Sequence, residues 1–315
     1  MSGFLQEHTQ EWLEYFSRHG YPDVKPLAAG VEGAIYLLGN GTVAKVWGRK
    51  RQPELIRMQQ FYADVARADL SFTTPEILRV EVINDLAVTF ERYLSGEPLQ
   101  KRLAFEDLDL DEGTVECVIG VLRALRTVPG TDAMKQLPVL DEDRPFWQGA
   151  DDFPTAFIGL LERRVARFGD LLRQHVPDFG LRYARVLERL AALDRVSLTV
   201  IHGDLFAENI LVDAHVSARA VLDFGFLSTA GDPRLDASIT AAIMNMYGPH
   251  APSIAASLTS RLAAGLDYPV EVLVLYRAAY AIATSNAFTE DGSDGHFPWC
   301  VAQLTAPAVT DVLGL

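Results

Sequence analysis

Three oxygen-bearing side chains in the second half of the chain have types and a spacing that suit phosphoryl transfer. Asp204 follows an apolar run, Asn209 comes five residues later, and Asp223 follows a second apolar run. Phosphoryl transfer requires that the phosphate charge be neutralised and that the acceptor oxygen be held in line, and oxygen-ligated magnesium serves the first need. Because both runs are too short for helices, we expect two strands that bring these side chains to one point. The pattern predicts a magnesium–phosphate site.

Simpler interpretations exist for the same residues. The carboxylates and the amide could cap helices or turns. We favour the phosphate site because the motifs at residues 202–209 and 223–225 occur in register, which unrelated caps would not require. For His202 we favour a structural role, in which the ring braces the loop through a hydrogen bond to backbone, over direct participation in the chemistry.

A lysine in the first part of the chain has a position suited to nucleotide phosphates. Lys45 and Val43 lie two residues apart in a predicted strand, so their side chains share one face. We expect Lys45 to reach the phosphates and Val43 to cover the adenine; the alternative is a solvated lysine on an edge strand. Among the acids of the following helix, we prefer Glu54 to Asp64 as the partner that orients Lys45.

The first 94 residues are predicted to form a small β lobe with one internal helix. Asn40-Gly41 is typical of a two-residue hairpin turn. Gly30 and Gly33, just before this hairpin, could let the backbone lie over phosphates, or could simply be turn glycines. The elements expected here are helices at 4–19 and from Pro53 to Val65, and strands at 33–39, 42–47, 76–83 and 86–92.

After Ser95-Gly96 the pattern becomes mostly helical, which predicts a second lobe over 95–315 and a hinge near 91–96. The fold class expected is therefore α+β, bilobal and protein-kinase-like, with a nucleotide-binding lobe over 1–94 and a larger catalytic and substrate-binding lobe. Helices are expected at 111–128, 154–175, 179–194, 236–247, 252–265, 269–287 and 299–313. Short strands are expected at 198–201, 210–212 and 220–222, and an acidic mobile loop at 129–154.

Composition narrows the class of protein. The chain has 315 residues, a formal net charge of -14 and two cysteines, Cys117 and Cys300. The negative charge disfavours a nucleic-acid partner, since such proteins need clustered Lys and Arg. No apolar run reaches the length of a membrane span and the N-terminus lacks a secretory signal pattern. We expect a cytoplasmic protein with no membrane partner, either a monomer or a weak homodimer.

The chain resembles the aminoglycoside phosphotransferase family. The resemblance rests on His-Gly-Asp-x-x-x-x-Asn at 202–209, Asp-Phe-Gly at 223–225 and Gly-Asp-Pro-x-x-Asp at 231–236, together with the order of the elements. It implies a small-molecule kinase that uses ATP and Mg²⁺, with Asp204 as the catalytic residue that accepts or orients the acceptor hydroxyl. Asn209 and Asp223 would be the magnesium ligands.

The resemblance also implies roles for residues outside the catalytic loop. Lys45 would contact the nucleotide phosphates, and the backbone of Arg92 and Leu94 would hold the adenine. Asp236 is expected to be structural, because an Asp near a helix N-terminus offsets unpaired amides.

Two other classes of protein compete with this interpretation. A protein kinase normally has Arg where this chain has Gly203, and here only five residues separate Asp-Phe-Gly from Gly231, which leaves no room for a regulated activation segment. A catalytically inactive nucleotide-binding scaffold would be expected to have lost a core residue, and none is missing.

The acceptor is the most open question. It could be an aminoglycoside or related cationic antibiotic or an amino sugar, with a role in antibiotic resistance, or a metabolite such as a sugar, a choline-like alcohol or homoserine. Acidic candidates for an ammonium contact are Asp151, Asp152, Glu290 and Asp291, with solvated loops as the alternative. Aromatic candidates for a sugar-stacking wall are Trp147, Phe153, Phe297 and Trp299, with core packing as the alternative.

Overall fold

The computed structural model describes residues 8–30, 32–104 and 106–315, and within these ranges the chain is an α+β protein with two compact units. The first unit comprises the described residues up to Gly96 together with Arg219–Leu222, and the second comprises Glu97–Ala218 and Asp223–Leu315. The α+β class predicted from the sequence is confirmed. None of the described helices is both long and apolar enough to span a membrane.

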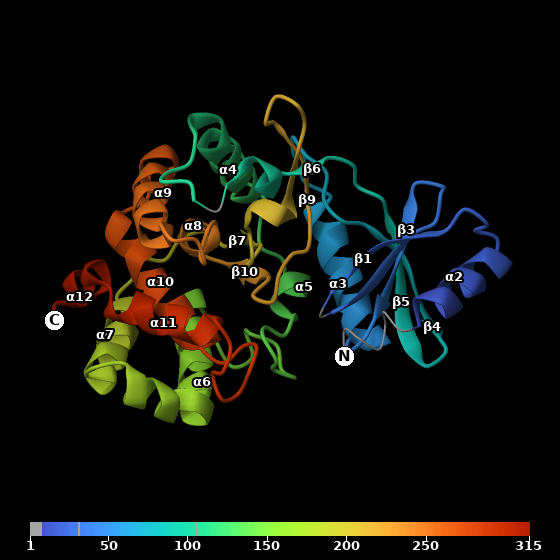
Figure 1. Cartoon of the computed structure of the whole chain (residues 1–315). Helices are drawn as coiled ribbons and strands as arrows, with labels where there is room; N and C mark the ends of the chain where they lie inside the picture. Colours follow the sequence, from blue (N-terminus) through green and yellow to red (C-terminus); the bar gives the residue numbers. More distant parts are fainter. Residues whose placement is uncertain (1–7, 31, 105) are drawn as a thin grey trace. The chain divides into compact units, whose positions relative to one another are not determined.

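The first unit is built on a five-stranded antiparallel sheet in the order β1-β2-β3-β5-β4 (Figure 1). The strands are β1 (Lys25–Ala29), β2 (Gly33–Leu37), β3 (Thr42–Trp47), β4 (Ile77–Ile83) and β5 (Leu86–Arg92). The predicted hairpin around Asn40-Gly41 is confirmed, but its loop has three residues, Gly39 to Gly41, rather than two: Leu37 pairs with Val43, and the N–H of Leu38 donates to the carbonyl of Thr42 at 2.9 Å. Gly41 takes a φ of +78° that favours glycine. β1 was not predicted, because all five of its residues are exposed and its sequence has no alternating pattern.

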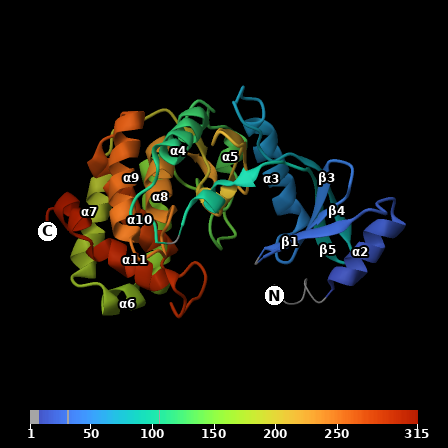
Figure 2. The same ribbon diagram turned by 45° about the horizontal axis from the view of Figure 1, so that its top comes forward.

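Two helices cover opposite faces of this sheet, as can be followed in Figure 2. Trp12 and Phe16 of α2 (Thr9–Arg18) pack against side chains such as Val46, whereas Leu55 of α3 (Gln52–Val65) packs against Trp47. Because Val46 and Trp47 are neighbours on one strand, their side chains point to opposite faces. Residues 4–7 of the helix predicted over 4–19 lie outside the described residues.

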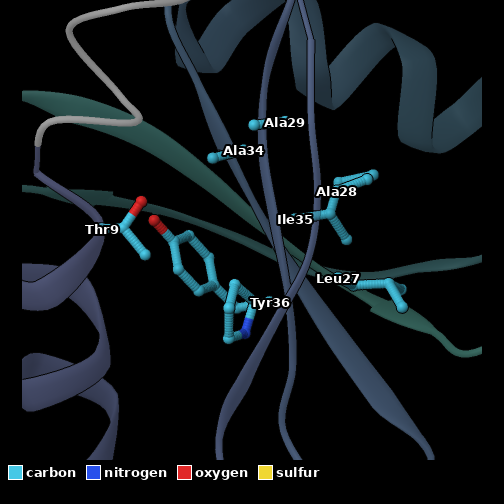
Figure 3. Close-up of a pocket in the computed structure, with 8 residues that line it drawn as sticks. Thr9, Leu27, Ala28, Ala29, Ala34, Ile35 and Tyr36 are labelled. Carbon is cyan, nitrogen blue, oxygen red and sulfur yellow. The ribbon is translucent and has the colours of Figure 1, made fainter.

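A small pocket of about 200 Å³ lies beside β1 and β2 (Figure 3). Its lining is mostly apolar, with Leu27 and Ala28 from β1, Ala34 and Tyr36 from β2, and Thr9 at the start of α2. None of the predicted site residues lines it.

The second unit is mainly helical and surrounds α10, which packs against α6, α7, α8, α9, α11 and α12. Its helices are α4 (Glu112–Leu125), α5 (Asp132–Lys135), α6 (Phe153–His175), α7 (Phe179–Ala191), α8 (Pro233–Ile243), α9 (Ala251–Leu266), α10 (Val270–Thr284), α11 (His296–Thr305) and α12 (Pro307–Leu313). The single helix predicted over 299–313 is in fact two, because Pro307 cannot continue the hydrogen-bond ladder of α11. The segment predicted as a loop at 129–154 contains α5.

Short strands in the second unit present the polar motifs. β7 (Thr199–Ile201) pairs with β10 (Thr229–Gly231), and β8 (Ile210–Val212) pairs with β6 (Glu97–Pro98). The turns η1 (Leu99–Arg102) and η2 (Ala207–Asn209) adjoin them, and β9 (Ala218–Val221) follows β8 along the chain. Thr73 exchanges backbone hydrogen bonds with Arg219 and Val221, which explains why residues 219–222 belong to the first unit.

Candidate active site

The loop that follows β7 is fixed by a buried carboxylate. Asp236, on α8, accepts hydrogen bonds from the backbone N–H of His202 at 2.7 Å and of Gly203 at 2.8 Å. Burial raises the pKa of Asp236 from its ordinary value to about 6, although the two amides oppose this shift. We expected this side chain to stabilise the start of its own helix. It instead stabilises the loop after β7. Asp232 is the residue that caps α8, accepting from the backbone of Arg234 at 2.9 Å.

Only glycine fits at position 203. Its φ is +77°, in the left-handed region, and a Cβ atom there would lie 2.4 Å from the carbonyl carbon of Leu227. An arginine at this position would be disfavoured by both the backbone conformation and the close approach of Leu227. Packing therefore also explains why this chain differs from protein kinases here.

Asp204 and Asn209 are brought together by the turn between them. The Asn209 Nδ2 atom donates to the backbone carbonyl of Asp204 at 2.9 Å, and Asn209 is buried at the end of η2. Since a carbonyl accepts only from the NH₂ group, this bond fixes the orientation of the amide and directs its oxygen away from the loop backbone. The Asn209 oxygen is then available for a cation.

The Asp-Phe-Gly segment packs directly on the His-Gly-Asp loop. Gly225 donates its backbone N–H to the carbonyl of His202 at 2.8 Å, and the Ser228 hydroxyl donates to the same carbonyl at 2.6 Å. The ring of His202 stacks on that of Phe224 with centroids 4.5 Å apart. These contacts fit a bracing role for His202, whose Nδ1 accepts from the backbone N–H of Asp204 at 3.3 Å. Ser228 was missed because nothing in its sequence context distinguishes it.

Asp223 is exposed and its backbone has a φ of +41°, which is uncommon for a residue other than glycine. Strained backbone of this kind often occurs at functional sites. Asp223 is exposed, whereas the next residue, Phe224, is buried.

In the first unit, Lys45 is paired with an acid that the sequence did not single out. Its ammonium nitrogen lies 3.4 Å from a carboxylate oxygen of Glu32 and 4.0 Å from the centroid of the Trp47 ring. Lys50 contacts the same carboxylate at 2.9 Å. Partial burial raises the pKa of Glu32, but the two ammonium groups outweigh this and bring the pKa below its ordinary value.

The predicted pairing of Lys45 with Glu54 needs correction. Glu54 accepts a hydrogen bond from the backbone N–H of Arg51 at 2.7 Å, which forms a capping box at the start of α3. An acid at the third helical position is well placed for this bond, because the first amides of a helix lack partners. Glu32, between Gly30 and Gly33, is an acid that contacts Lys45.

The other nucleotide-site candidates of the first unit are placed as follows. Val43 is buried on the same face of β3 as Lys45. A Cβ atom at Gly33 would lie 2.2 Å from the carbonyl oxygen of Val46, so this glycine is required for close strand pairing, whereas Gly30 has open space around it. The backbone N–H of Arg92 donates to the carbonyl of Glu76 at 3.0 Å, so this N–H already has a partner. Leu94 has no backbone hydrogen bond among the described residues, so both of its backbone groups are available.

Three of the four acids predicted to meet an ammonium group already have local partners. Asp152 caps α6 and contacts Arg195 at 2.8 Å, Glu290 pairs with Arg167, and Asp291 accepts from the backbone of Ser293 at 3.0 Å. Asp151 is exposed beside Asp152. The aromatic candidates are core residues: Trp147, Phe153, Phe297 and Trp299 are all buried.

The described residues contain no group of three or more His, Cys, Asp or Glu arranged to hold a metal ion. Magnesium in nucleotide sites does not require such a group, because it keeps several waters and is held by one or two protein ligands plus the phosphates. The oriented amide oxygen of Asn209 and the exposed carboxylate of Asp223 are oxygen donors of the type that magnesium prefers. Their chemistry therefore fits this ion.

The α+β fold and the paired His-Gly-Asp and Asp-Phe-Gly loops define an enzyme of the phosphotransferase class. The chain belongs to the phosphotransferase enzyme family, whose model matches residues 23–270, and the resemblance found in the sequence is thereby confirmed. No curated protein sequence matches the chain significantly.

Solved structures with related folds cover nearly the whole chain. A macrolide 2′-phosphotransferase type I has a TM-score of 0.58 at 17% identity, covering 95% of this chain and 97% of its own. The GDP complex of aminoglycoside 2′-phosphotransferase-IIIa has a TM-score of 0.63 at 15% identity, covering 92% and 95%. A macrolide 2′-phosphotransferase from Brachybacterium faecium has a TM-score of 0.57 at 17% identity, covering 94% and 98%. At these identities the likeness concerns the fold.

Proposed function

We propose that this protein transfers the γ-phosphoryl group of ATP to a hydroxyl group of a small molecule, with Asp204 as the catalytic residue. The observation that carries the proposal is the clamp on the Asp204 loop, whose backbone is held by Asp236 on one side and by Gly225 on the other. Preorganisation of this kind matters because misplacing a reacting group by about 1 Å can cost on the order of 100-fold in rate.

In the proposed mechanism, the carboxylate of Asp204 accepts a hydrogen bond from the acceptor hydroxyl and aims its oxygen at the γ-phosphorus. Asn209 and Asp223 hold Mg²⁺, which when bound neutralises phosphate charge. The ammonium group of Lys45 binds the nucleotide phosphates, and Glu32 restricts the positions that this group can occupy. Val43 and the backbone of Arg92 and Leu94 contact the adenine.

A small-molecule acceptor is favoured over a protein. Phe226–Ala230 are the only residues between Asp-Phe-Gly and Gly231, and within this stretch the chain already enters β10, which pairs with β7. A regulated activation segment would have to be inserted where this strand begins. We therefore propose that the enzyme is constitutively active. We also propose that it is cytoplasmic and is either a monomer or a weak homodimer.

The class of acceptor is proposed from related structures. Structures with related folds include an aminoglycoside phosphotransferase crystallised with GDP and kanamycin, which supports an antibiotic as one candidate. Amino sugars, and metabolites such as sugars, choline-like alcohols or homoserine, are the alternative. An inactive scaffold is disfavoured because Lys45, Asp204, Asn209 and Asp223 are all present.

The test is acceptor-dependent release of ADP or GDP. Purified protein with Mg²⁺ and either ATP or GTP is mixed with aminoglycosides, macrolides, sugars, amino sugars and amino alcohols. We expect at least one class of alcohol to stimulate nucleotide consumption and to gain a phosphate by mass spectrometry. Tight nucleotide binding without transfer to any acceptor, or efficient transfer to polypeptides alone, would contradict the proposal.

A further inference from the structure

A cluster of aromatic rings begins immediately after the Asp-Phe-Gly segment. The ring of Phe226 lies 6.1 Å from that of Phe288, which lies 5.1 Å from His296 in an edge-on arrangement. His296 in turn stacks on Trp299 at 5.3 Å. The cluster thus runs from the catalytic loops to α11, with its buried end formed by His296 and Trp299 and its open end by Phe288.

A packing contact and an electrostatic effect both relate this cluster to Asp204. Gly225 lies against the Asp204 side chain, and Phe226 is the next residue. Tyr280, whose ring contacts both His296 and Trp299, has a pKa raised by burial first and then by the negative charge of Asp204. The open end of the cluster and the carboxylate that would orient the acceptor therefore belong to one region of the second unit.

The loop that carries Phe288 is held by its own polar side chains. Asn286 donates to the carbonyl of Glu290 at 2.8 Å, and the Thr289 hydroxyl donates to Asp294 at 2.7 Å. Asp294 also accepts from the backbone of His296 at 2.8 Å. Phe288 itself remains 63% exposed. An exposed aromatic ring on a braced loop differs from a surface residue that could turn inward, because the loop conformation holds the ring outside the core.

The titratable groups of the loop that carries Phe288 and of the start of α11 have local partners or are neutral. The carboxylate of Glu290 contacts Arg167, and those of Asp291 and Asp294 accept hydrogen bonds from loop backbone. Burial lowers the pKa of His296 to about 4, so its ring is uncharged at neutral pH. A polycation would have to compete with Arg167 for the carboxylate of Glu290, whereas a neutral apolar ring would pack on Phe226 and Phe288 without an ionic partner.

We propose that Phe226 and Phe288 form the wall against which the acceptor packs, and that the acceptor is an uncharged alcohol with an apolar face, such as a neutral glycoside that carries a hydrophobic group. This inference rests on the proposed function and selects, among its candidate acceptors, a neutral molecule over a cationic one. The half-buried Phe226 would contact the part of the acceptor nearest the reacting hydroxyl, and the exposed Phe288 would contact the part beyond it. Aromatic side chains suit this task because their flat faces bury apolar area with few rotamers to fix.

The test compares three probes on the full-length protein with Mg²⁺ and a non-hydrolysable ATP analogue. Phenyl β-glucoside is neutral and carries an apolar ring, glucose lacks the ring, and kanamycin is a polyamine. Titration calorimetry should give a dissociation constant for phenyl β-glucoside at least about tenfold below that of the other two. Phe288→Ala should remove this preference and Phe288→Tyr should retain it. Leu181→Ala, at a comparably exposed apolar residue on α7, should leave it unchanged.

The proposal is overturned if kanamycin binds most tightly, if Phe288→Ala keeps the preference for the phenyl group, or if phenyl β-glucoside does not bind. Turnover of the same probes with ATP is measured in parallel. Binding with the expected preference but without ADP release would count against the phosphotransfer proposal alone, so the two failures can be told apart.

Discussion

Gly225 lies directly against Asp204, so closely that a Cβ atom at position 225 would be 2.0 Å from the Cβ atom of Asp204. The third residue of the Asp-Phe-Gly motif is thus fixed by the position of the proposed catalytic side chain. This contact explains in physical terms why the two motifs occur together. The His-Gly-Asp motif supplies the carboxylate of Asp204. The Asp-Phe-Gly motif supplies Gly225, and only glycine is small enough to leave room for Asp204.

We expect Gly225→Ala to lower kcat by about 100-fold or more, because the added methyl group must displace either Asp204 or the loop that follows it. The KM for ATP should change little. Steady-state kinetics with a responsive acceptor would measure both parameters. Gly120→Ala on α4 is the matched control, since nothing lies within 4 Å of a Cβ atom at that position. A Gly225→Ala variant with normal turnover would show that the close packing is not needed.

The acids around Lys45 give a second prediction. Glu32→Gln should raise the KM for ATP a few-fold, because Lys45 loses the carboxylate that restricts its position. The effect should be modest, since Glu32 is 54% exposed at its side chain and exposed ion pairs are weak. Glu54→Gln should leave the KM for ATP unchanged and lower stability by less than about 1 kcal/mol through the helix cap. If Glu54→Gln raised the KM for ATP and Glu32→Gln did not, Glu54 would be the partner of Lys45.

His296 predicts a pH dependence of stability. Its pKa is about 4 in the folded chain against an ordinary value of 6.5, so between these values the unfolded chain binds more protons. The free energy of unfolding should therefore rise with pH from 4 to 6.5, by on the order of 3 kcal/mol from this residue. Nearby Asp294 opposes the shift in part.

The contribution of His296 is isolated by His296→Phe, which keeps an aromatic ring but cannot titrate. Denaturant unfolding of both proteins at several pH values gives the difference. The subtraction is needed because Asp236, with a pKa raised to about 6, has the opposite sign: its contribution falls as pH rises from 3.8 to 6. A difference between the two proteins that stays constant over pH 4 to 6.5 would show that His296 is not buried as described.

The loops that we propose to be catalytic could be located from sequence, while several residues that hold them could not. Asp204, Asn209 and Asp223 stand after short apolar runs, and this pattern indicates strands that end at a polar site. Their supports depend on contacts between distant segments. Asp236 looked like a residue at the start of a helix, but its partners lie more than thirty positions earlier in the chain, where no local pattern can reveal them. Glu32 was overlooked for a similar reason, because it is thirteen residues from Lys45.

The helices and strands differ in the same way: some follow from local sequence, and others depend on a partner that is distant in the chain. The hairpin around Asn40-Gly41 follows from turn chemistry and was correctly predicted, although its loop has three residues rather than the two expected. β10, with the sequence Thr-Ala-Gly, has no strand pattern of its own and exists because β7 offers it a partner. The break before Pro307 was readable in principle, since proline cannot sit inside a helix, but the apolar spacing on both sides concealed it.

The central claim is that Asp204 carries out phosphoryl transfer, and the kcat of Asp204→Asn tests it most directly. Asn keeps the shape of the side chain but cannot act as a base, so kcat should fall by about 10²–10⁴-fold while the dissociation constant for ATP stays within about twofold. Glu208→Gln, an exposed acid in the same loop, is the control and should retain normal turnover. Near-normal turnover in Asp204→Asn would contradict the account.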